Sequence, residues 1–542
     1  MASLGGFDQV VAISQQRINS ALKVRHEDNE LKSILQELTA HSPNDKDGLM
    51  KATLSPSTVE LYVPGEPQKA IFRLNFQDGY FDYPEGSDGM LQRLSVKGWS
   101  LAFLASLSPS KLAQVPSTIK GDITQDIVES IERTGSYSLS QILIDLGTAN
   151  VVNFDFSRSI TPGLVESEET KKRALEIFMK VYINQLAEGG HNILGYAITA
   201  AKPSEGSLAP VSVALQVMPC ADGPDVSTET RQNDSLLFLE MVGSLNGRGS
   251  PPFPLSGSRM WFPEQATAVM LVHRSAFWER FLAQNLSFLL SDAFRLTNSI
   301  AHWLKGDNIK DEITQEEAWI ISDPGNKDST YHWDSIGDRS ANFHRSQKWN
   351  IPKHDITWQG SSVDDKEVTS DVTVDANITP GTQSITVETK IKYYYVHSHT
   401  DTFIDMSLGS PNVPTATSTE TIDADISWTT KLTLNSVSMG KLAVVANVEG
   451  NPNFTCNVSD HAQGLIGQLA NEKKLNQHAT QRVTEYLKSV TESSGRIQAL
   501  AQAGLRVYPH FVLSGGGSYM MKSPTFTSDC DLQVTLYPIM GA

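Results

Sequence analysis

The first apolar run of the chain changes into a helical pattern at a single serine. Residues 10–13 are apolar and mostly β-branched, which is typical of a strand. After Ser14, the spacing of Ile18, Ala21 and Leu22 places apolar side chains on one face of a helix. Serine is a favoured N-cap because its hydroxyl accepts from a free N–H of the first turn. The pattern therefore predicts a strand that leads directly into a helix capped by Ser14.

Further along, apolar and polar positions alternate with a period of two. This alternation runs through residues 59–63 and 70–76, and continues with Trp99, Leu101 and Phe103. A period of two places one side of each segment in a core and the other in water. The region predicts a meander of half-buried antiparallel strands.

Other segments have a helical period. Residues 138–149 predict a short helix, and residues 275–303 predict a long buried helix or helix pair. A long helical region is also expected from Ser459 to about residue 503. The clearest amphipathic helix is predicted over residues 169–186, with an apolar face made by Ala174, Ile177, Phe178, Val181 and Tyr182.

A second region rich in predicted strands follows a boundary near residue 350. Alternation is strict over residues 389–395 and 424–434, and the second run is long for a strand. Segregated runs of strands and helices favour the α+β class. We expect long curved antiparallel sheets wrapped around long helices, in two lobes. The predicted lobes are residues 1–350 and residues 351–542, the second containing the helical region near 459–503.

The 542 residues are enough for more than one hydrophobic core. A formal charge of −17 disfavours nucleic acid as a partner, because phosphate binding needs clustered Lys and Arg. Three widely separated cysteines make a poor disulfide framework. The N-terminus lacks the basic and apolar regions of a Sec signal, and no apolar run is long enough to span a membrane. The expected location is the cytoplasm, or outside the cell by a route without a Sec signal.

Catalytic motifs are largely missing from the sequence. No phosphate-binding loop, dinucleotide fingerprint, nucleophile elbow or paired-histidine zinc helix is present. The sharpest metal candidate is His397, His399 and Asp401, which alternate onto one face of a strand. They resemble part of the HxHxDH signature of metallo-β-lactamase-like hydrolases, but Thr402 stands where the last histidine is needed. We therefore expect no metal, no cofactor and no enzymatic activity, and keep a metal-dependent hydrolase as a remote alternative.

A proline-rich loop over residues 250–264 carries several large apolar residues. Prolines exclude a central strand, so part of the loop is open to contact with a membrane interface or a partner. The competing interpretation is a loop folded against its own domain. The candidate contact residues are Phe253, Leu255, Trp261 and Phe262.

The opening residues VVAISQQRINSAL resemble the start of TULIP (tubular lipid-binding) domains, where a strand passes through Ser-Gln into a long helix. The aromatic-Asp-x-Val start at Phe7 to Val10 and the Ile18-Asn19 pair are similar to the P-forty-seven/Orf-X accessory proteins of clostridial neurotoxin clusters. The resemblance covers about the first forty residues. It implies a sheet rolled around a helix and a lipid-like ligand or membrane contact, and it supplies no catalytic residue.

These observations favour a non-enzymatic protein that binds lipid or another apolar ligand in a groove between sheet and helix. The candidate ligand-binding residues are Ile18, Leu22, Trp99 and Phe103. The expected partners are a hydrophobic small molecule, with a protein partner and peripheral membrane contact left open. The alternative is an accessory component of a toxin or other protein complex, without a ligand cavity.

Overall fold

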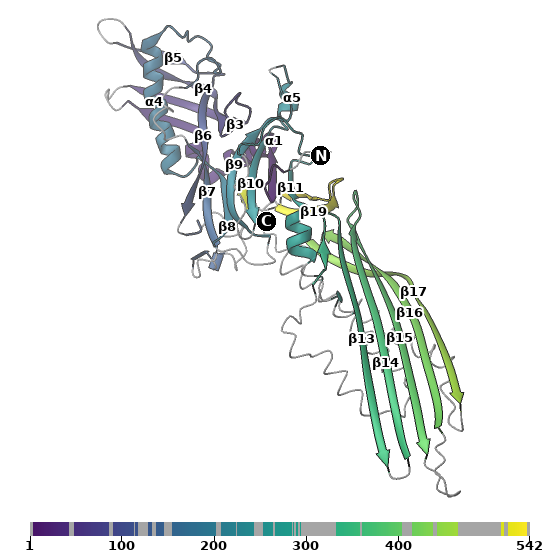
Figure 1. Ribbon diagram of the computed structural model, residues 1–542. Helices are drawn as coiled ribbons and strands as arrows, with labels where there is room; N and C mark the ends of the chain where they lie inside the picture. Colours follow the sequence, from purple (N-terminus) through teal and green to yellow (C-terminus); the bar gives the residue numbers. More distant parts are fainter. Residues whose placement is uncertain are drawn as a thin grey trace, which may run out of the picture.

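The computed structural model shows an elongated molecule built from three antiparallel sheets (Figure 1). One end carries two sheets and the helices, and a sheet of very long strands extends from them. The structure describes residues 4–42, 48–85, 90–112, 114–116, 128–129, 131–132, 137–145, 154–201, 208–223, 225–242, 253–263, 266–283, 286, 289–290, 293, 332–357, 360–403, 415–436, 442–463, 511–513 and 519–538.

The first sheet has six strands in the order β19-β20-β11-β1-β10-β9. It joins the two ends of the chain, because β1 and the C-terminal β20 both pair with β11. Its strands are β1 (Gln9–Ser14), β9 (Pro210–Met218), β10 (Ser235–Val242), β11 (Ala268–Val272), β19 (Tyr519–Phe526) and β20 (Leu532–Pro538).

The second sheet has eight strands and packs beside the longest described helix. Its order is β18-β8-β7-β6-β4-β3-β2, with β5 paired to β4. The strands are β2 (Glu37–His41), β3 (Leu49–Glu60), β4 (Lys69–Glu85), β5 (Met90–Ser95), β6 (Ser100–Leu112), β7 (Tyr137–Asp145), β8 (Ile193–Ala200) and β18 (Phe511–Leu513).

The predicted start of the chain is confirmed. The helix α1 (Gln15–His26) follows β1 at once, and the Ser14 side chain accepts from the N–H of Arg17 (3.2 Å). All six residues of β1 are buried, since Val11 and Ile13 face one hydrophobic cluster and Val10 and Ala12 face another.

The predicted amphipathic helix is also confirmed, as α4 (Glu169–Glu188). Ala174, Phe178 and Tyr182 are among its buried residues. Other helical elements in the described part of the chain are short: η1 (Asn29–Leu31), α2 (Lys32–Leu35), α5 (Thr228–Arg231) and the π-helical η4 (Ser275–Leu282). None of the described helices is long and apolar enough to span a membrane.

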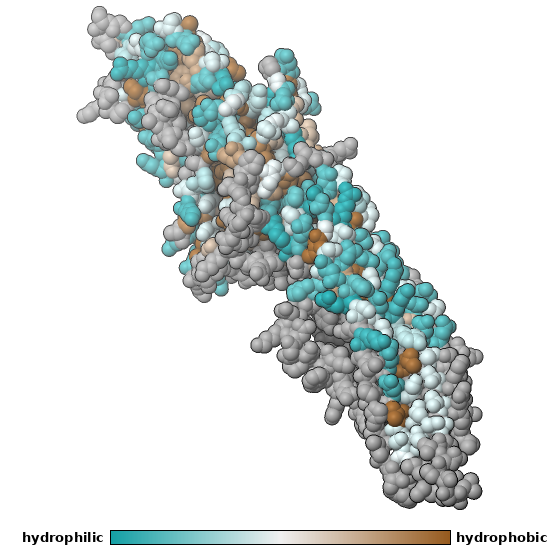
Figure 2. Space-filling view, viewed as in Figure 1, coloured by the Kyte–Doolittle hydropathy of each residue, from teal (hydrophilic) through white to brown (hydrophobic). Residues whose placement is uncertain are grey.

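The third sheet is made of long strands in the order β12-β13-β14-β15-β16-β17. Its visible face is mostly hydrophilic in Figure 2. Its strands are β12 (Ser335–Ile336), β13 (Ser340–Thr357), β14 (Gly360–Ile378), β15 (Ser384–Phe403), β16 (Thr415–Ser436) and β17 (Leu442–Gln463).

The alternation predicted for the long strands is confirmed where side chains are described. Ile391 and Tyr393 of β15 are buried, whereas Lys392 between them is exposed. On the exposed face, Lys392 lies in register between Asp371 of β14 and Asp425 of β16. Opposite charges on neighbouring strands stabilise this register, because a one-residue slip would turn the lysine into the apolar face.

Two helix predictions were wrong. Residues 138–145 belong to β7, which pairs with β6 and β8. The helical region expected from Ser459 begins inside β17, which continues to Gln463; its later residues lie outside the described part of the chain.

The coarse prediction of an α+β chain rich in antiparallel strands is confirmed, while long helices wrapped by the sheets and two lobes stay predictions. The expected division at residue 350 falls inside β13. The C-terminal strands β18 and β20 pair with β8 and β11 of the N-terminal part. Buried residues from Ile18 to Tyr393 belong to one contiguous cluster.

The prolines of the five long strands are confined to the two outermost ones. Pro352 lies in β13 and Pro452 in β17, whereas β14, β15 and β16 contain none. In the described part of the chain β13 pairs outward only with the two residues of β12, and β17 pairs only with β16. Proline has no N–H to offer an added strand, so both edges are unfavourable templates for edge-to-edge pairing.

We predict that the double substitution Pro352→Val and Pro452→Val increases self-association. Each valine restores a backbone donor and raises β-propensity at an edge. Light scattering over a dilution series should show a concentration-dependent rise in mass. Thr373→Val, on the central strand β14, is the control and should leave the mass unchanged. A variant as monodisperse as the parent would show that the edges are protected by other means.

Candidate functional site

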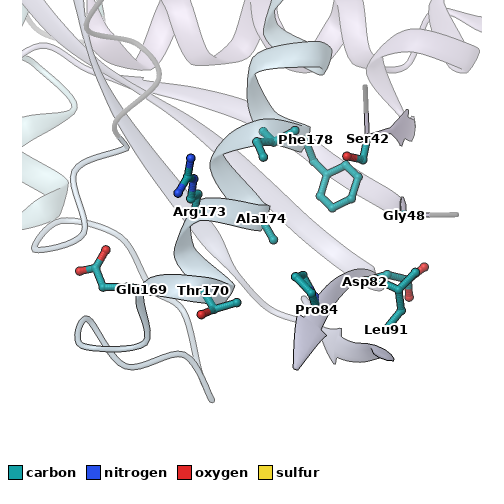
Figure 3. A pocket seen from close by; sticks show the side chains of 11 residues that line it. Ser42, Gly48, Asp82, Pro84, Leu91, Glu169, Thr170, Arg173, Ala174 and Phe178 are labelled. Carbon is teal, nitrogen blue, oxygen red and sulfur yellow. The ribbon is translucent and has the colours of Figure 1, made fainter. Parts of the chain in front are cut away.

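A cavity lies beside the first half of α4. Its volume is about 540 Å³, and it is partly open to solvent. Figure 3 shows α4 on one side of it and the end of β4 with the start of β5 on the other. It is lined by Ser42, Gly48, Asp82, Pro84, Leu91, Glu169, Thr170, Arg173, Ala174, Ile177 and Phe178.

The apolar wall of this cavity comes from the buried face of α4. Ala174 and Phe178 are one helical turn apart and both point towards the β4–β5 side (Figure 3). Ala174 contributes only a methyl group, which leaves space between the helix and the sheet. Phe178 is held in place by Phe81 of β4, whose ring lies edge-on at 6.3 Å between centroids. A small residue beside an anchored aromatic ring therefore shapes the apolar side of the cavity.

The polar side of the cavity is formed by charges and hydroxyl groups. Asp82 is almost fully buried, and its carboxylate accepts from Nε of Arg93 (2.9 Å). This hydrogen bond raises the pKa of Arg93. Glu169 and Arg173 project from the other side of α4 (Figure 3). The cavity thus combines an apolar wall with a charged rim of both signs.

The charged groups of the cavity form an ion pair rather than a catalytic set. Asp82 is already neutralised by Arg93, and no nucleophile–base pair lies among the lining residues. In the ranges that the structure describes, no three His, Cys, Asp or Glu side chains are grouped as a metal site. The side chains of His397, His399 and Asp401 lie outside the described residues, so the metal interpretation of that segment stays untested.

Three of the four predicted ligand-binding residues lie in the main hydrophobic cluster. Ile18, Trp99 and Phe103 have at most 2% of their surface exposed. Trp99 is fixed by its indole N–H, which donates to the carbonyl of Pro162 (3.0 Å). Its ring contacts Phe81 at 6.0 Å between centroids. Trp99 is not among the residues that line the cavity, and its assignment as a ligand contact stays a prediction.

The fourth residue, Leu22, borders a different and much smaller cavity between α1 and α4. That cavity has a volume of about 30 Å³ and also contacts Arg25 and Tyr182. The structure thus does not bring the four predicted residues together around one cavity.

The proline-rich loop is divided between buried and exposed residues. Trp261 and Phe262 are buried in a second cluster, and Arg259 stacks on Trp261 at 4.0 Å. The backbone of Leu255 is bound to the side chain of Gln216 by two hydrogen bonds (2.6 and 2.8 Å).

Two large apolar residues of this loop are exposed. Phe253 is 41% exposed and Met260 is 52% exposed. Of the four predicted contact residues, Phe253 is the exposed one. The role of all four stays a prediction.

The sequence identified the helix that borders the large cavity but not the cavity itself. Ala174 and Phe178 were placed on the apolar face of the helix, where they were indistinguishable from ordinary core residues. Asp82 and Leu91 were missed, because their approach to α4 depends on how β4 and β5 pair. The one local signal is the small Ala174 in a stripe of large apolar residues.

No protein-family model matches the chain, and no curated protein matches it. Among solved structures, the chain is similar to P47 of Clostridium botulinum E1, with 12% identity, a TM-score of 0.44 and 99% of both chains covered. It is also similar to a lipopolysaccharide binding protein, with 10% identity, a TM-score of 0.32 and 99% of both chains covered. The first of these is a protein of the kind named by the resemblance of the opening residues.

Proposed function

We propose that this chain is a non-enzymatic binding protein that holds a lipid or another apolar or amphipathic molecule in the cavity beside α4. The observation that carries the proposal is the cavity of about 540 Å³. Ligand sites in proteins typically have volumes of roughly 300–1,000 Å³, with mostly apolar walls and a few polar groups that fix orientation.

The lining supports an amphipathic ligand in particular. Leu91, Ala174, Ile177 and Phe178 provide apolar surface on which a hydrocarbon segment is removed from water. Each buried methylene contributes about 0.8 kcal/mol, so even a short chain supplies useful affinity. The hydroxyl of Thr170 and the charged rim offer hydrogen bonds to a polar head group.

The proposal predicts that Ile177→Trp removes bound ligand without unfolding the protein. Ile177 lines the cavity and is only half-buried, so an indole at this position extends into the open space. Native mass spectrometry and lipid extraction, on protein purified without detergent, should show bound acyl species in the parent and at least a tenfold loss in the variant. Lys180→Trp, on the exposed side of α4, is the matched control and should retain the ligand.

Two outcomes would contradict the proposal. One is a bare mass for the parent in repeated preparations and after incubation with lipid vesicles. The other is equal loading of the parent and Ile177→Trp, which would place the ligand elsewhere in the molecule.

A second candidate function is that of an accessory component that binds a protein partner. The observation that favours it is the exposure of Phe253 and Met260, two large apolar side chains close in sequence on the same loop. The parent should then co-purify with a defined partner at stoichiometric yield, and the double substitution Phe253→Ser and Met260→Ser should abolish this recovery. The amount of bound ligand should be the same in both proteins. Stoichiometric recovery of the same partner with the variant would exclude this loop as the contact.

A further inference from the structure

The small cavity between α1 and α4 has an apolar side, made by Leu22, Leu35, Phe72 and Leu186, and a polar side without a carboxylate. Arg25 and His26 come from α1, Tyr182 comes from α4, and Ser57 comes from β3. His191, just after α4, completes its polar side. A half-buried cavity of this composition is complementary to negative charge.

Arg25 is the central group because none of its hydrogen bonds among the described residues goes to a carboxylate. Its Nη1 donates to the carbonyls of His191 (3.4 Å) and Ile193 (3.2 Å). In the part of the chain that the structure describes, the hydrogen bonds of this guanidinium go to two carbonyls and a histidine ring, and none goes to a carboxylate. The carboxylate of Asp28, near the end of α1, instead accepts from the N–H of Glu30 (2.9 Å).

The third hydrogen bond of Arg25 shows that His191 is in its neutral form. Nη2 of Arg25 lies 3.3 Å from Nδ1 of His191. A guanidinium has no acceptor, so Nδ1 must accept and His191 is neutral in this contact. Burial and the neighbouring Arg25 charge both lower the pKa of His191, which agrees with the neutral form. A guanidinium has five N–H groups, and Nε–H and one Nη2–H are left without a partner among the described residues.

Two other polar groups of the cavity donate hydrogen bonds to backbone carbonyls. Nε2 of His26 donates to the carbonyl of Leu54 (3.1 Å), and the Tyr182 hydroxyl donates to the carbonyl of Ile34 (2.8 Å). Burial lowers the pKa of Arg25 by more than the nearby charge of Asp28 raises it. A charge held away from water without a partner is costly, and a bound anion relieves that cost.

We propose that this cavity is a binding site for a small anion of carboxylate size, held by the unused N–H groups of Arg25 and the hydroxyl of Ser57. The volume of about 30 Å³ sets the size of the ligand. One water-sized group needs roughly 10–15 Å³ by the same measure, so the cavity holds about two to three non-hydrogen atoms. A carboxylate group has three and matches the planar fork of a guanidinium, whereas sulfate and phosphate have five.

The carboxylate has two sources, a free small acid and the head group of a fatty acid. Binding of ¹³C-carboxyl-labelled acetate and octanoate is measured by NMR at constant ionic strength set with sodium sulfate, which is too large for the cavity. We expect saturable binding of one equivalent to the parent, and at least a tenfold loss of affinity in Arg25→Gln. Lys23→Gln removes one positive charge from an exposed position of the same helix and should bind as the parent does.

A second variant separates binding from folding. Ser57→Val fills the cavity without changing charge, and it should weaken binding while circular dichroism remains that of the parent. Tighter binding of octanoate than of acetate identifies a fatty-acid head group, and equal binding identifies a free small anion. Unsaturable binding of both ligands by the parent, or equal affinity in Arg25→Gln, overturns the proposal.

A comparison of two variants separates the anion site from the larger cavity beside the start of α4. Loss of binding in Arg25→Gln with full binding in Ile177→Trp would support the anion site and count against the larger cavity as the site for this ligand. The reverse pattern would overturn the anion site and leave the proposed function intact.

Discussion

Replacing Glu240 by glutamine is expected to stabilise the protein strongly at pH 8. Glu240 lies in β10 with none of its surface exposed, on the face shared with Leu236 and Phe238. Neither carboxyl oxygen has a hydrogen-bond partner among the described residues. Gln9, opposite in register on β1, also has an unpaired side-chain oxygen, since only its amide N–H₂ is used, by the carbonyl of Leu208 (2.6 Å).

Burial alone raises the pKa of Glu240 from 4.5 to about 8. The folded state therefore keeps the proton between these two pH values, whereas the unfolded state loses it. Because the folded-state pKa is the higher one, the contribution to stability is complete below about pH 4.5 and is lost as pH rises to about 8. The loss approaches about 1.4 kcal/mol per pH unit, which sums to the order of 5 kcal/mol over this interval.

Urea unfolding between pH 5 and pH 9 tests this expectation. The difference in free energy of unfolding between Glu240→Gln and the parent should grow with pH and level off above pH 8. Taking the difference cancels the titration of other groups, such as Glu176 and Asp531, whose pKa values are also raised by burial. Glu188→Gln, at an exposed position of α4, should run parallel to the parent. Parallel profiles for Glu240→Gln and the parent would mean that Glu240 is solvated in the folded state.

Elements governed by local chemistry were predictable from the sequence. Ser14 caps α1 because its hydroxyl, and the apolar spacing that follows, act within a few residues. The long strands were predictable because alternation over residues 424–434 repeats for far longer than chance allows, and every second residue is buried as expected.

Elements governed by long-range pairing were not predictable. Residues 138–145 have a helical spacing of apolar residues, but β6 and β8 supply hydrogen-bonding partners on both sides and the segment is a strand. Ser459 resembles an N-cap, yet it continues the ladder with Thr421 of β16. In both cases a neighbour distant in sequence overrides the local preference.

The functional residues were the least predictable part. The sequence favoured Ile18, Trp99 and Phe103 because they are large, apolar and correctly spaced, which are also the properties of core residues. The larger cavity exists because Ala174 has only a methyl group where its neighbours on the helix face are large. The smaller cavity is distinguished by Arg25, whose guanidinium is hydrogen-bonded to no carboxylate among the described residues. Such absences appear only when distant segments are brought together.

Because Ile18 is a core residue, a substitution there would test folding rather than ligand binding. With none of its surface exposed, Ile18 is a core residue, and Ile18→Asp would bury a carboxylate without a partner. Loss of ligand in that variant would follow from unfolding, so it would not report on the site.

Phe178→Ala is the second substitution with a large expected effect, and it tests both the fold and the site. Phe178 is 2% exposed and contacts Phe81 edge-on, while one side of its ring borders the cavity beside α4. Truncation of a buried phenylalanine costs about 3–5 kcal/mol, because apolar contacts are lost and a cavity remains. Against a typical stability of about 5–15 kcal/mol, this is a severe loss.

The effect on ligand binding should be opposite to the effect on stability. Removing the ring enlarges the cavity, so the folded fraction of Phe178→Ala should still bind ligand and accept bulkier acyl chains than the parent does. Ile177→Trp should show the reverse, with stability close to that of the parent and no ligand. Urea unfolding and native mass spectrometry on both variants, with Phe178→Leu as the milder control, separate packing from binding. If Phe178→Ala loses less than about 1 kcal/mol, its ring is not part of the core, because a packed phenylalanine cannot be removed so cheaply.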